Sequence, residues 1–219
     1  MLPRTLEPEV MDTQEDAMEY DAMDHSHVNR VFVEDLLQCE PLGRDVLDVG
    51  TGTALIPVEL CARNEDVRVM AYDASVEMLE VARFHLESKG LMQRIQLQFG
   101  DAKTMIFQDA YFDTVMSNSI VHHIPEPEIV IAEMVRVLRP GGLLFVRDLY
   151  RPDTEAEVEH LVDTYARGET DYSRQLLRQS FHAALRLDEI QAMVGRLGFP
   201  ASTVTMTSDR HWTWNARKA

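Results

Sequence analysis

Apolar residues follow two alternating spacings through the middle of the chain. Short apolar or alternating runs predict strands at 45–49, 67–72, 95–99, 112–118 and 143–146. Between these runs, apolar residues recur at helical spacing and predict helices at 53–64, 75–89 and 128–138. Strands that alternate with helices in this way are typical of a parallel, doubly wound α/β sheet with right-handed crossovers.

Local signals agree with these boundaries. Gly90 directly follows the helical pattern at 75–89, and glycine commonly ends a helix. The Arg-Pro-Gly-Gly segment at 139–142 predicts a turn before the strand at 143–146. That last strand is continuously apolar, as expected for a central strand that is buried on both faces.

The flanking regions predict additional elements. Residues 1–16 are acidic, contain two prolines and predict little regular structure, whereas Val28, Val31, Phe32 and Leu36 predict a helix that Asp24 or Ser26 caps. The region 149–186 is polar and helical in pattern, and another helix is expected at about 187–197. Two β-rich runs at 202–207 and 210–214 predict a terminal antiparallel hairpin, with Trp212 and Trp214 on one face.

The predicted fold is therefore a Rossmann-like, mostly parallel seven-stranded sheet with a C-terminal antiparallel hairpin and helical cap elements. We expect residues 1–40 to form an N-terminal arm and lid helix, and residues 41–219 to form the main domain with its helical insertion at 149–186. Because these two segments are not needed to complete the sheet, we expect both to fold over the carboxyl ends of the strands.

Composition narrows the possible partners. The formal net charge is −16, and residues 1–25 hold eight acids and one base, Arg4. Such a charge repels a phosphate backbone, so nucleic acid is not expected as a substrate. No run of about 18 apolar residues predicts a membrane span. The only cysteines, Cys39 and Cys61, have no metal spacing and are typical of reduced thiols in a cytoplasmic protein.

The most informative stretch is the glycine turn that follows the first strand. Gly50 and Gly52 come between this strand and a helix, an arrangement that lets the backbone approach a ligand and presents free N–H groups to it. Leu55 stands where a dinucleotide-binding fingerprint needs a third glycine. Asp48, just before the turn, suits a cationic, amino-bearing ligand better than a pyrophosphate.

The Asp-x-Gly-x-Gly segment at 48–52, with Asp73 ending the next strand, resembles motif I of the class I S-adenosylmethionine (SAM) methyltransferases. The resemblance extends from about residue 46 to 148 and is closest to the small-molecule branch that includes ubiquinone and menaquinone biosynthesis enzymes. Ala54 departs from the pattern, because the family often has a further glycine there.

Polar residues at successive strand ends give the candidate cofactor site. Carboxyl ends of parallel strands meet at one edge of a doubly wound sheet, which is where ligands bind. A carboxylate at Asp73 can accept hydrogen bonds from two ribose hydroxyls. The resemblance implies that Asp101 and Ala102 lie at the adenine edge and that Asn118 faces the methionine part of SAM. The full set of candidate cofactor residues is Asp48, Gly50, Thr51, Gly52, Asp73, Ala74, Asp101, Ala102 and Asn118.

Candidate catalytic residues lie in the loop after the fourth strand. His123, and next to it His122, are candidates for a general base, although packing or helix capping would also explain either. Asp148 and Tyr150 are possible acceptor-binding groups, with capping and packing as the alternative. No His, Asp or Glu cluster has a typical metal spacing, so no metal ligand is expected. The loop at 117–120 lacks the Asn-Pro-Pro-Tyr sequence of exocyclic-amine methyltransferases, which favours an oxygen or carbon acceptor.

The resemblance implies a SAM-dependent methyltransferase of small-molecule metabolism. Two other interpretations stay open. A non-catalytic SAM- or nucleotide-binding module would use the acidic arm and the insertion for protein contacts. An NAD(P)-linked oxidoreductase is disfavoured by the missing third glycine and by the lack of a Tyr-x-x-x-Lys pair. The oligomeric state is not predicted.

Overall fold

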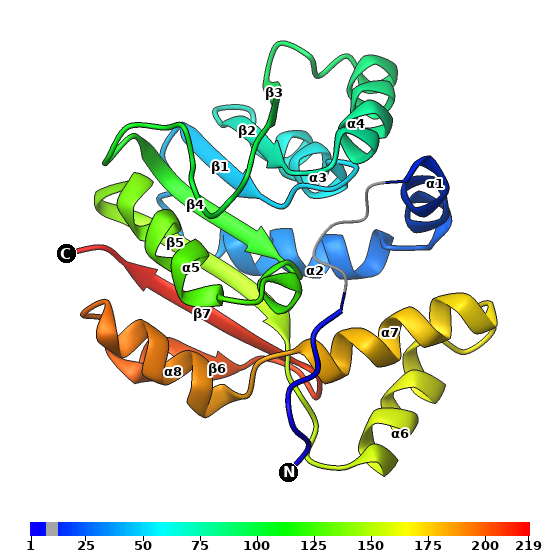
Figure 1. The fold of residues 1–219 in the computed structure, drawn as a ribbon. Coiled ribbons are helices and arrows are strands. Elements are labelled where there is room, and N and C mark those ends of the chain that lie inside the picture. The colour runs from blue at the N-terminus through cyan, green and yellow to red at the C-terminus, as the bar shows by residue number, and fades with distance from the viewer. Residues whose placement is uncertain (8–12) are drawn as a thin grey trace.

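A seven-stranded sheet with strand order β3-β2-β1-β4-β5-β7-β6 forms the centre of the molecule (Figure 1). The computed structural model describes residues 1–7 and 13–219. The strands are β1 (Asp45–Val49), β2 (Arg68–Asp73), β3 (Ile95–Phe99), β4 (Phe112–Asn118), β5 (Leu138–Leu149), β6 (Val204–Met206) and β7 (His211–Arg217). The predicted Rossmann-like fold is confirmed.

The strand pairing also follows the prediction. β1 pairs in parallel with β2 and β4, β2 with β3, and β4 with β5. β7 runs antiparallel to β5 and β6, so the terminal hairpin is present. β1 and β4 are adjacent although they are far apart in sequence. Successive strands are therefore added toward one edge of the sheet from β1 to β3 and toward the other edge from β4 onward. This reversal opens a crevice at the carboxyl ends of these two strands.

Helices cover both faces of the sheet. The α-helices of the described residues are α1 (Gln14–Ala22), α2 (Ser26–Leu37), α3 (Leu55–Arg63), α4 (Val76–Lys89), α5 (Pro127–Val137), α6 (Glu155–Tyr165), α7 (Asp171–Ala183) and α8 (Leu187–Arg196). Side chains of α2, α3 and α4 share one apolar cluster with the sheet, and those of α5 and α8 share the cluster on the other face. The fully buried Trp212 and Trp214 both belong to the α5–α8 side, as their alternation on β7 predicts.

Local capping explains several helix ends. The Ser75 hydroxyl accepts a hydrogen bond from the Met78 backbone N–H at 3.2 Å and starts α4, and Gly90 ends it with φ of 68°. The Thr154 hydroxyl and the Glu157 carboxylate form a capping box that starts α6. Within the described ranges, every helix is too short or too polar to cross a bilayer.

The structure corrects two local predictions. Helix α1 begins at Gln14, inside the stretch that was expected to be irregular; of that stretch, residues 8–12 lie outside the described part. Strand β5 begins at Leu138 and includes the predicted turn at 139–142. The turn is a local interruption, since Leu138 pairs with Phe112 and Leu143 already pairs with Thr114. The apolar run at 143–149 continues as regular strand beyond it.

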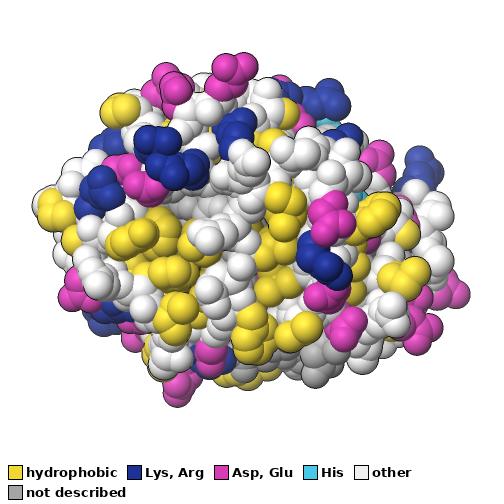
Figure 2. Space-filling model, turned by 90° about the horizontal axis from the view of Figure 1, so that it is seen from above, with side chains coloured by type: hydrophobic (Ala, Val, Ile, Leu, Met, Phe, Trp, Pro, Cys, Tyr) yellow, Lys and Arg dark blue, Asp and Glu magenta, His cyan; other side chains and the backbone are white. Residues whose placement is uncertain are grey.

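The elements outside the main layers lie beyond the carboxyl ends of the parallel strands (Figure 1). Helix α1 packs against α4, where the His85 Nε2 and Asp21 Oδ1 atoms are 2.8 Å apart. Helices α6 and α7 form a third apolar cluster around the fully buried Phe181. On the face seen from above in Figure 2, apolar side chains lie between acidic and basic ones. Exposed apolar residues include Phe84 of α4 and Phe99 at the end of β3.

Candidate active site

The turn after β1 brings the backbone to the floor of the crevice. Gly50 and Gly52 have φ of 72° and 54°, a left-handed conformation that glycine adopts without a steric cost. A Cβ atom on Gly50 would lie 2.0 Å from Cγ2 of Ile120, so a larger residue does not fit. Ala54, the departure from the motif, is also left-handed with φ of 59°, which an alanine adopts at some energetic cost.

The Asp73 carboxylate connects the ends of β1 and β2. Its Oδ2 atom accepts a hydrogen bond from the Gly52 N–H at 2.7 Å, and its Oδ1 atom accepts one from the Ser75 N–H at 2.9 Å. Burial raises the pKa of Asp73, while these backbone donors oppose the increase. Each carboxylate oxygen has a second lone pair, so the group is held in place and can still accept ligand hydroxyls.

Asp48 lies below the glycine turn and is almost fully buried. Burial raises the pKa of Asp48 to about 7; the 2.7 Å hydrogen bond from the Thr51 hydroxyl opposes this rise, and the nearby Asp73 adds to it. A small cavity next to Asp48 is bordered by Thr53 and Asn118. Among the described residues, the buried Thr53 Oγ1 and Asn118 Oδ1 atoms have no hydrogen-bond partner. A cationic donor placed here would satisfy all three groups.

A cavity of about 360 Å³ continues from this point along the strand ends. Its volume lies within the range of small-ligand pockets. The predicted residues among its walls are Gly50, Gly52, Asp73, Ala74, Asp101, Ala102, Asn118 and His123. Asp48 and Thr51 border the adjoining small cavity, which shares Tyr20, Gly50 and Asn118 with the larger one. The structure therefore brings every predicted cofactor residue to one continuous site.

Several wall residues were not among the predicted site residues. Tyr20 of α1, Met78 of α4, Phe99 of β3 and the loop residues Ser119 and Ile120 also line the cavity. Tyr20 lies over the glycine turn, since a Cβ atom on Gly52 would be 3.7 Å from its ring. Burial raises the pKa of Tyr20 to about 12. Apolar and aromatic side chains carry no distinctive sequence signal, which is why the motif did not single them out.

The two candidate histidines occupy different environments. Both belong to the short helix η1 (Val121–His123), but His123 lines the cavity whereas His122 is buried behind it. The His122 Nδ1 atom lies 2.5 Å from Oδ1 of the fully buried Asp148. Burial alone would lower the pKa of His122, but the Asp148 and Glu7 carboxylates together outweigh it and raise the pKa.

Asp148 also fixes the backbone of this loop. Burial would raise its pKa, but the pairing with His122 and the Leu149 N–H lowers it. Its Oδ2 atom accepts hydrogen bonds from the N–H groups of Val121 and His122, at 2.6 and 3.2 Å. Asp148 thus supports the histidine loop and is buried away from the cavity. Tyr150, the other possible acceptor-binding residue, packs against the apolar cluster beside α5 and α8.

Residues 1–7 pack against the loop that contains His122 and His123. The Arg4 guanidinium donates hydrogen bonds to the backbone carbonyls of His122, Ile124, Pro125 and Ala183. The Thr5 N–H donates to the His182 carbonyl at 3.0 Å, which joins the segment to α7. Glu7 follows, with its carboxylate beside both histidines. We refer to residues 1–7 as the N-terminal strap.

Comparisons with known proteins agree with this geometry. A family model described as a methyltransferase domain matches residues 47–146. The chain is 40% identical over 111 residues to a phosphatidylethanolamine N-methyltransferase from Cereibacter sphaeroides, a match that covers 51% of this chain and 53% of that protein. It is 28% identical over 190 residues to a ubiquinone biosynthesis O-methyltransferase from an Azoarcus species, covering 82% and 80%. The chain thus spans about half the length of the first of these relatives.

A solved structure decides the family. A protein from Bacillus halodurans C-125, described as a methyltransferase, is 30% identical; the match covers 80% of this chain and 70% of that chain, with a TM-score of 0.60. The chain belongs to the class I SAM-dependent methyltransferases. The resemblance inferred from the glycine turn and Asp73 is confirmed.

The site of this methyltransferase fits the cofactor of its family. SAM carries a ribose, a cationic amino group and a sulfonium. The cavity offers a fixed carboxylate at Asp73, and the smaller one offers a buried carboxylate with two unpartnered polar atoms beside it. Gly50 lines both cavities, and a Cβ atom there would collide with the Ile120 side chain. The individual roles of the predicted residues, and the catalytic roles of His122 and His123, stay predictions.

Proposed function

We propose that this protein transfers the methyl group of SAM to an oxygen or carbon atom of a small-molecule acceptor. The observation that carries the proposal is the pair of adjoining cavities at the strand ends. The larger contains His123 and most of the predicted cofactor residues in its wall, and the smaller contains Asp48 and Thr51. The matched relatives are named for O-, N- and C-methylation, so family membership leaves the accepting atom open. The formal net charge of −16 supports a small-molecule acceptor over nucleic acid.

In the proposed complex, Asp73 binds the ribose hydroxyls, and Asp48 with Asn118 faces the amino group of the methionine part. Asp101 and Ala102 border the adenine. A sulfonium is already an activated leaving group, so the protein mainly has to align the acceptor atom, the methyl group and the sulfur. An acceptor hydroxyl also has to lose its proton, and the His122–His123 pair is the proposed place for this event.

The segment before β1 and the insertion have proposed roles as covers. The helix predicted as a lid, α2, packs on a face of the sheet, so we assign the covering role to α1. Tyr20 of α1 lines the cavity beside Gly52, in the part that we propose holds SAM. Helix α7 of the insertion contacts η1, next to His123, where the acceptor would enter. Excluding water from the site favours transfer between the bound partners. We therefore propose that α1 closes over SAM and that α6, α7 and the strap shape the acceptor site.

Turnover with a panel of acceptors tests the proposal. The panel contains quinols and other phenols, activated carbon acids and primary amines, and formation of S-adenosylhomocysteine is measured. We expect turnover with phenols or carbon acids, and His123→Ala to lower kcat about 10²-fold while SAM affinity stays unchanged. Turnover with amines alone would contradict the proposed acceptor class. SAM binding without turnover on any acceptor would favour a non-catalytic module.

A further inference from the structure

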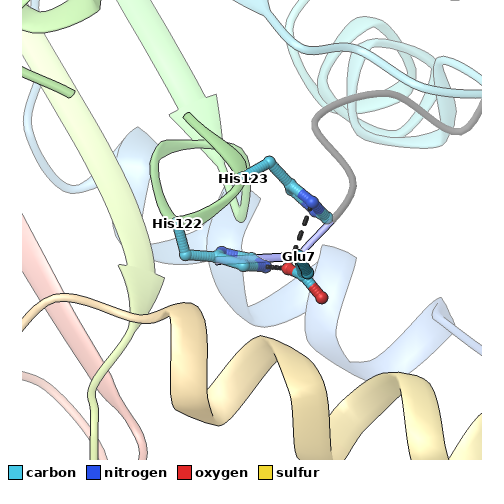
Figure 3. Close-up of side chains that lie close together, drawn as sticks. All are labelled: Glu7, His122 and His123. Carbon is cyan, nitrogen blue, oxygen red and sulfur yellow. Dashed lines mark ion pairs between the residues drawn. The ribbon is translucent and has the colours of Figure 1, made fainter. Parts of the chain in front are cut away.

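Three side chains from separate parts of the chain converge beside the cavity (Figure 3). Glu7 comes from the strap, and His122 and His123 come from η1. The Glu7 Oε1, His122 Nε2 and His123 Nδ1 atoms all lie within 4.8 Å of one another. Glu7 and His122 are buried, with side chains 6% and 3% exposed. A buried carboxylate between two imidazoles needs a positive charge or a proton to stabilise it.

Hydrogen bonding does not account for this arrangement. The Glu7 Oε1 atom lies 3.3 Å from His122 Nε2 and 3.1 Å from His123 Nδ1. Despite these short distances, this buried oxygen has no partner with hydrogen-bond geometry among the described residues. The two ring nitrogens are therefore close enough to the oxygen for ion pairs but outside hydrogen-bond geometry. Atoms arranged in this way can share a cation placed between them.

The surrounding contacts orient the ring and the carboxylate. The His122 Nδ1 atom is paired with Asp148, which leaves Nε2 as the nitrogen on the Glu7 side. A carboxylate that pairs with one ring nitrogen fixes the orientation of the imidazole. Histidines that bind a metal through the other nitrogen are usually held in this way. On the strap, the Glu7 Oε2 atom accepts a hydrogen bond from the Ser180 hydroxyl at 3.2 Å, and its Oε1 atom remains on the histidine side.

We propose that Glu7, His122 and His123 bind a divalent first-row transition metal ion, with Zn²⁺ as the representative. Ligand atoms about 2.0–2.1 Å from a zinc ion are about 3.3 Å apart in a tetrahedron. The Glu7 Oε1 atom lies at similar distances from the two nitrogens, 3.3 and 3.1 Å. Two imidazoles with one carboxylate suit Zn²⁺, Fe²⁺ or Ni²⁺, whereas Mg²⁺ and Ca²⁺ prefer oxygen ligands. Three protein ligands leave a coordination position open to a small molecule.

Because the metal site borders the cavity, the ion could take part in methyl transfer. This role rests on the proposed function. His123 belongs both to the metal cluster and to the wall of the cavity. An acceptor hydroxyl bound to the ion has a lowered pKa and releases its proton to water. The resulting oxyanion then attacks the methyl carbon, the carbon–sulfur bond breaks, and S-adenosylhomocysteine leaves as a neutral thioether. The two histidines would thus promote proton loss as metal ligands.

Zinc binding to the purified full chain tests the inference. The protein is treated with a chelator and dialysed, and Zn²⁺ is then titrated by calorimetry without SAM or acceptor. We expect one equivalent to bind, and Glu7→Gln and His123→Ala each to weaken binding by about tenfold or more. Co²⁺ in place of Zn²⁺ should give a visible absorption band that both substitutions remove.

Glu155→Gln provides a matched control. Glu155 lies beside a single histidine, with Oε2 3.4 Å from His182 Nε2, close to the strap but outside the cluster. This variant should bind zinc like the unaltered protein. Thermal melting of each variant without metal checks that it folds, and two ligand variants keep the test decisive if one of them does not.

The outcomes separate the metal site from the proposed function. Zinc binding that is equally strong in Glu7→Gln and His123→Ala, or no zinc binding by a folded protein, would overturn the metal site. Turnover could still be observed in that case, and the proposed function would stand. Zinc binding that depends on Glu7, combined with no turnover on any acceptor, would support the site and contradict the proposed function.

Discussion

At the residue scale, the buried charge of Asp48 makes a specific prediction about pH. Its pKa of about 7 reflects burial first and then the nearby Asp73 carboxylate, opposed by the Thr51 hydroxyl. A cationic ligand beside Asp48 binds the ionised carboxylate. The affinity for such a ligand is therefore at its maximum above this pKa and decreases as the pH falls through it. Burial raises the pKa of the nearby Asp73 as well. Burial also raises the pKa of Tyr20 to about 12, so its hydroxyl stays neutral throughout.

We expect the dissociation constant of SAM to be constant from pH 8 to 7.5 and to rise by up to about tenfold per pH unit below pH 7. Calorimetry at several pH values measures it. Asp48→Asn should bind SAM weakly at every pH and show no such slope. An equally steep slope in Asp48→Asn would assign the pH dependence to another group.

Individual site residues were predictable where a strand end fixes their position. Asp48, Asp73 and Asn118 lie at the carboxyl ends of β1, β2 and β4, and Asp101 comes just after β3. Topology alone therefore brings them to one edge of the sheet. Glu7 was not predictable, because nothing in its local sequence indicates that the strap returns to η1. The expectation that no metal ligand is present was based on spacing within segments, and the proposed cluster joins two distant ones.

At the scale of elements, α1 was the main omission. Its sequence is acidic, and of the side chains described in it only Ala17 is buried. Its position depends on contacts with other elements, such as the His85–Asp21 pair and the stacking of Tyr20 on His25 with ring centroids 4.4 Å apart. The regular strands and their helices were predictable, because each combines a clear period with caps such as Ser75 and Gly90.

A helix held by so few buried contacts should open easily when the cofactor is absent. We expect amide hydrogen exchange in α1 to slow by about tenfold or more when S-adenosylhomocysteine binds, because Tyr20 then contacts the ligand as well as the protein. Exchange in α6, away from the cofactor, serves as the internal reference. Equal exchange of α1 in both states would show that this helix does not close over the cofactor.

At the scale of the whole molecule, the strap connects parts that the sheet does not. Through Arg4 it joins the η1 loop to the end of α7, and through Glu7 it approaches the histidines. This connection was outside sequence prediction, since the acidic character of residues 1–25 suggested a loosely packed arm. The parallel, doubly wound character of the sheet, by contrast, was predictable from the alternation of strands and helices.

Arg4→Ala tests whether the strap organises the acceptor side. Hydrogen bonds to a charged group each contribute about 1.5–3 kcal/mol, but half-exposed ones contribute less, so we expect a total loss of about 1–3 kcal/mol. For a chain of this size such a loss lowers Tm by about 2–12 °C. The KM for the acceptor should rise, while the dissociation constant of SAM should stay unchanged, since Arg4 contacts only backbone of the loop and α7.

Arg178→Ala is the matched control for this substitution. Arg178 is paired with Glu159 on the exposed side of α7, with Nε 2.5 Å from Oε1, and exposed pairs contribute at most about 1 kcal/mol. Its loss should leave the KM for the acceptor unchanged, because this pair touches neither the strap nor η1. A rise in KM in Arg4→Ala alone would connect the strap to the acceptor site. Equal effects of both substitutions on KM would show that the strap only stabilises α7. Weaker SAM binding in Arg4→Ala would show that the strap acts on the cofactor site and not on the acceptor site.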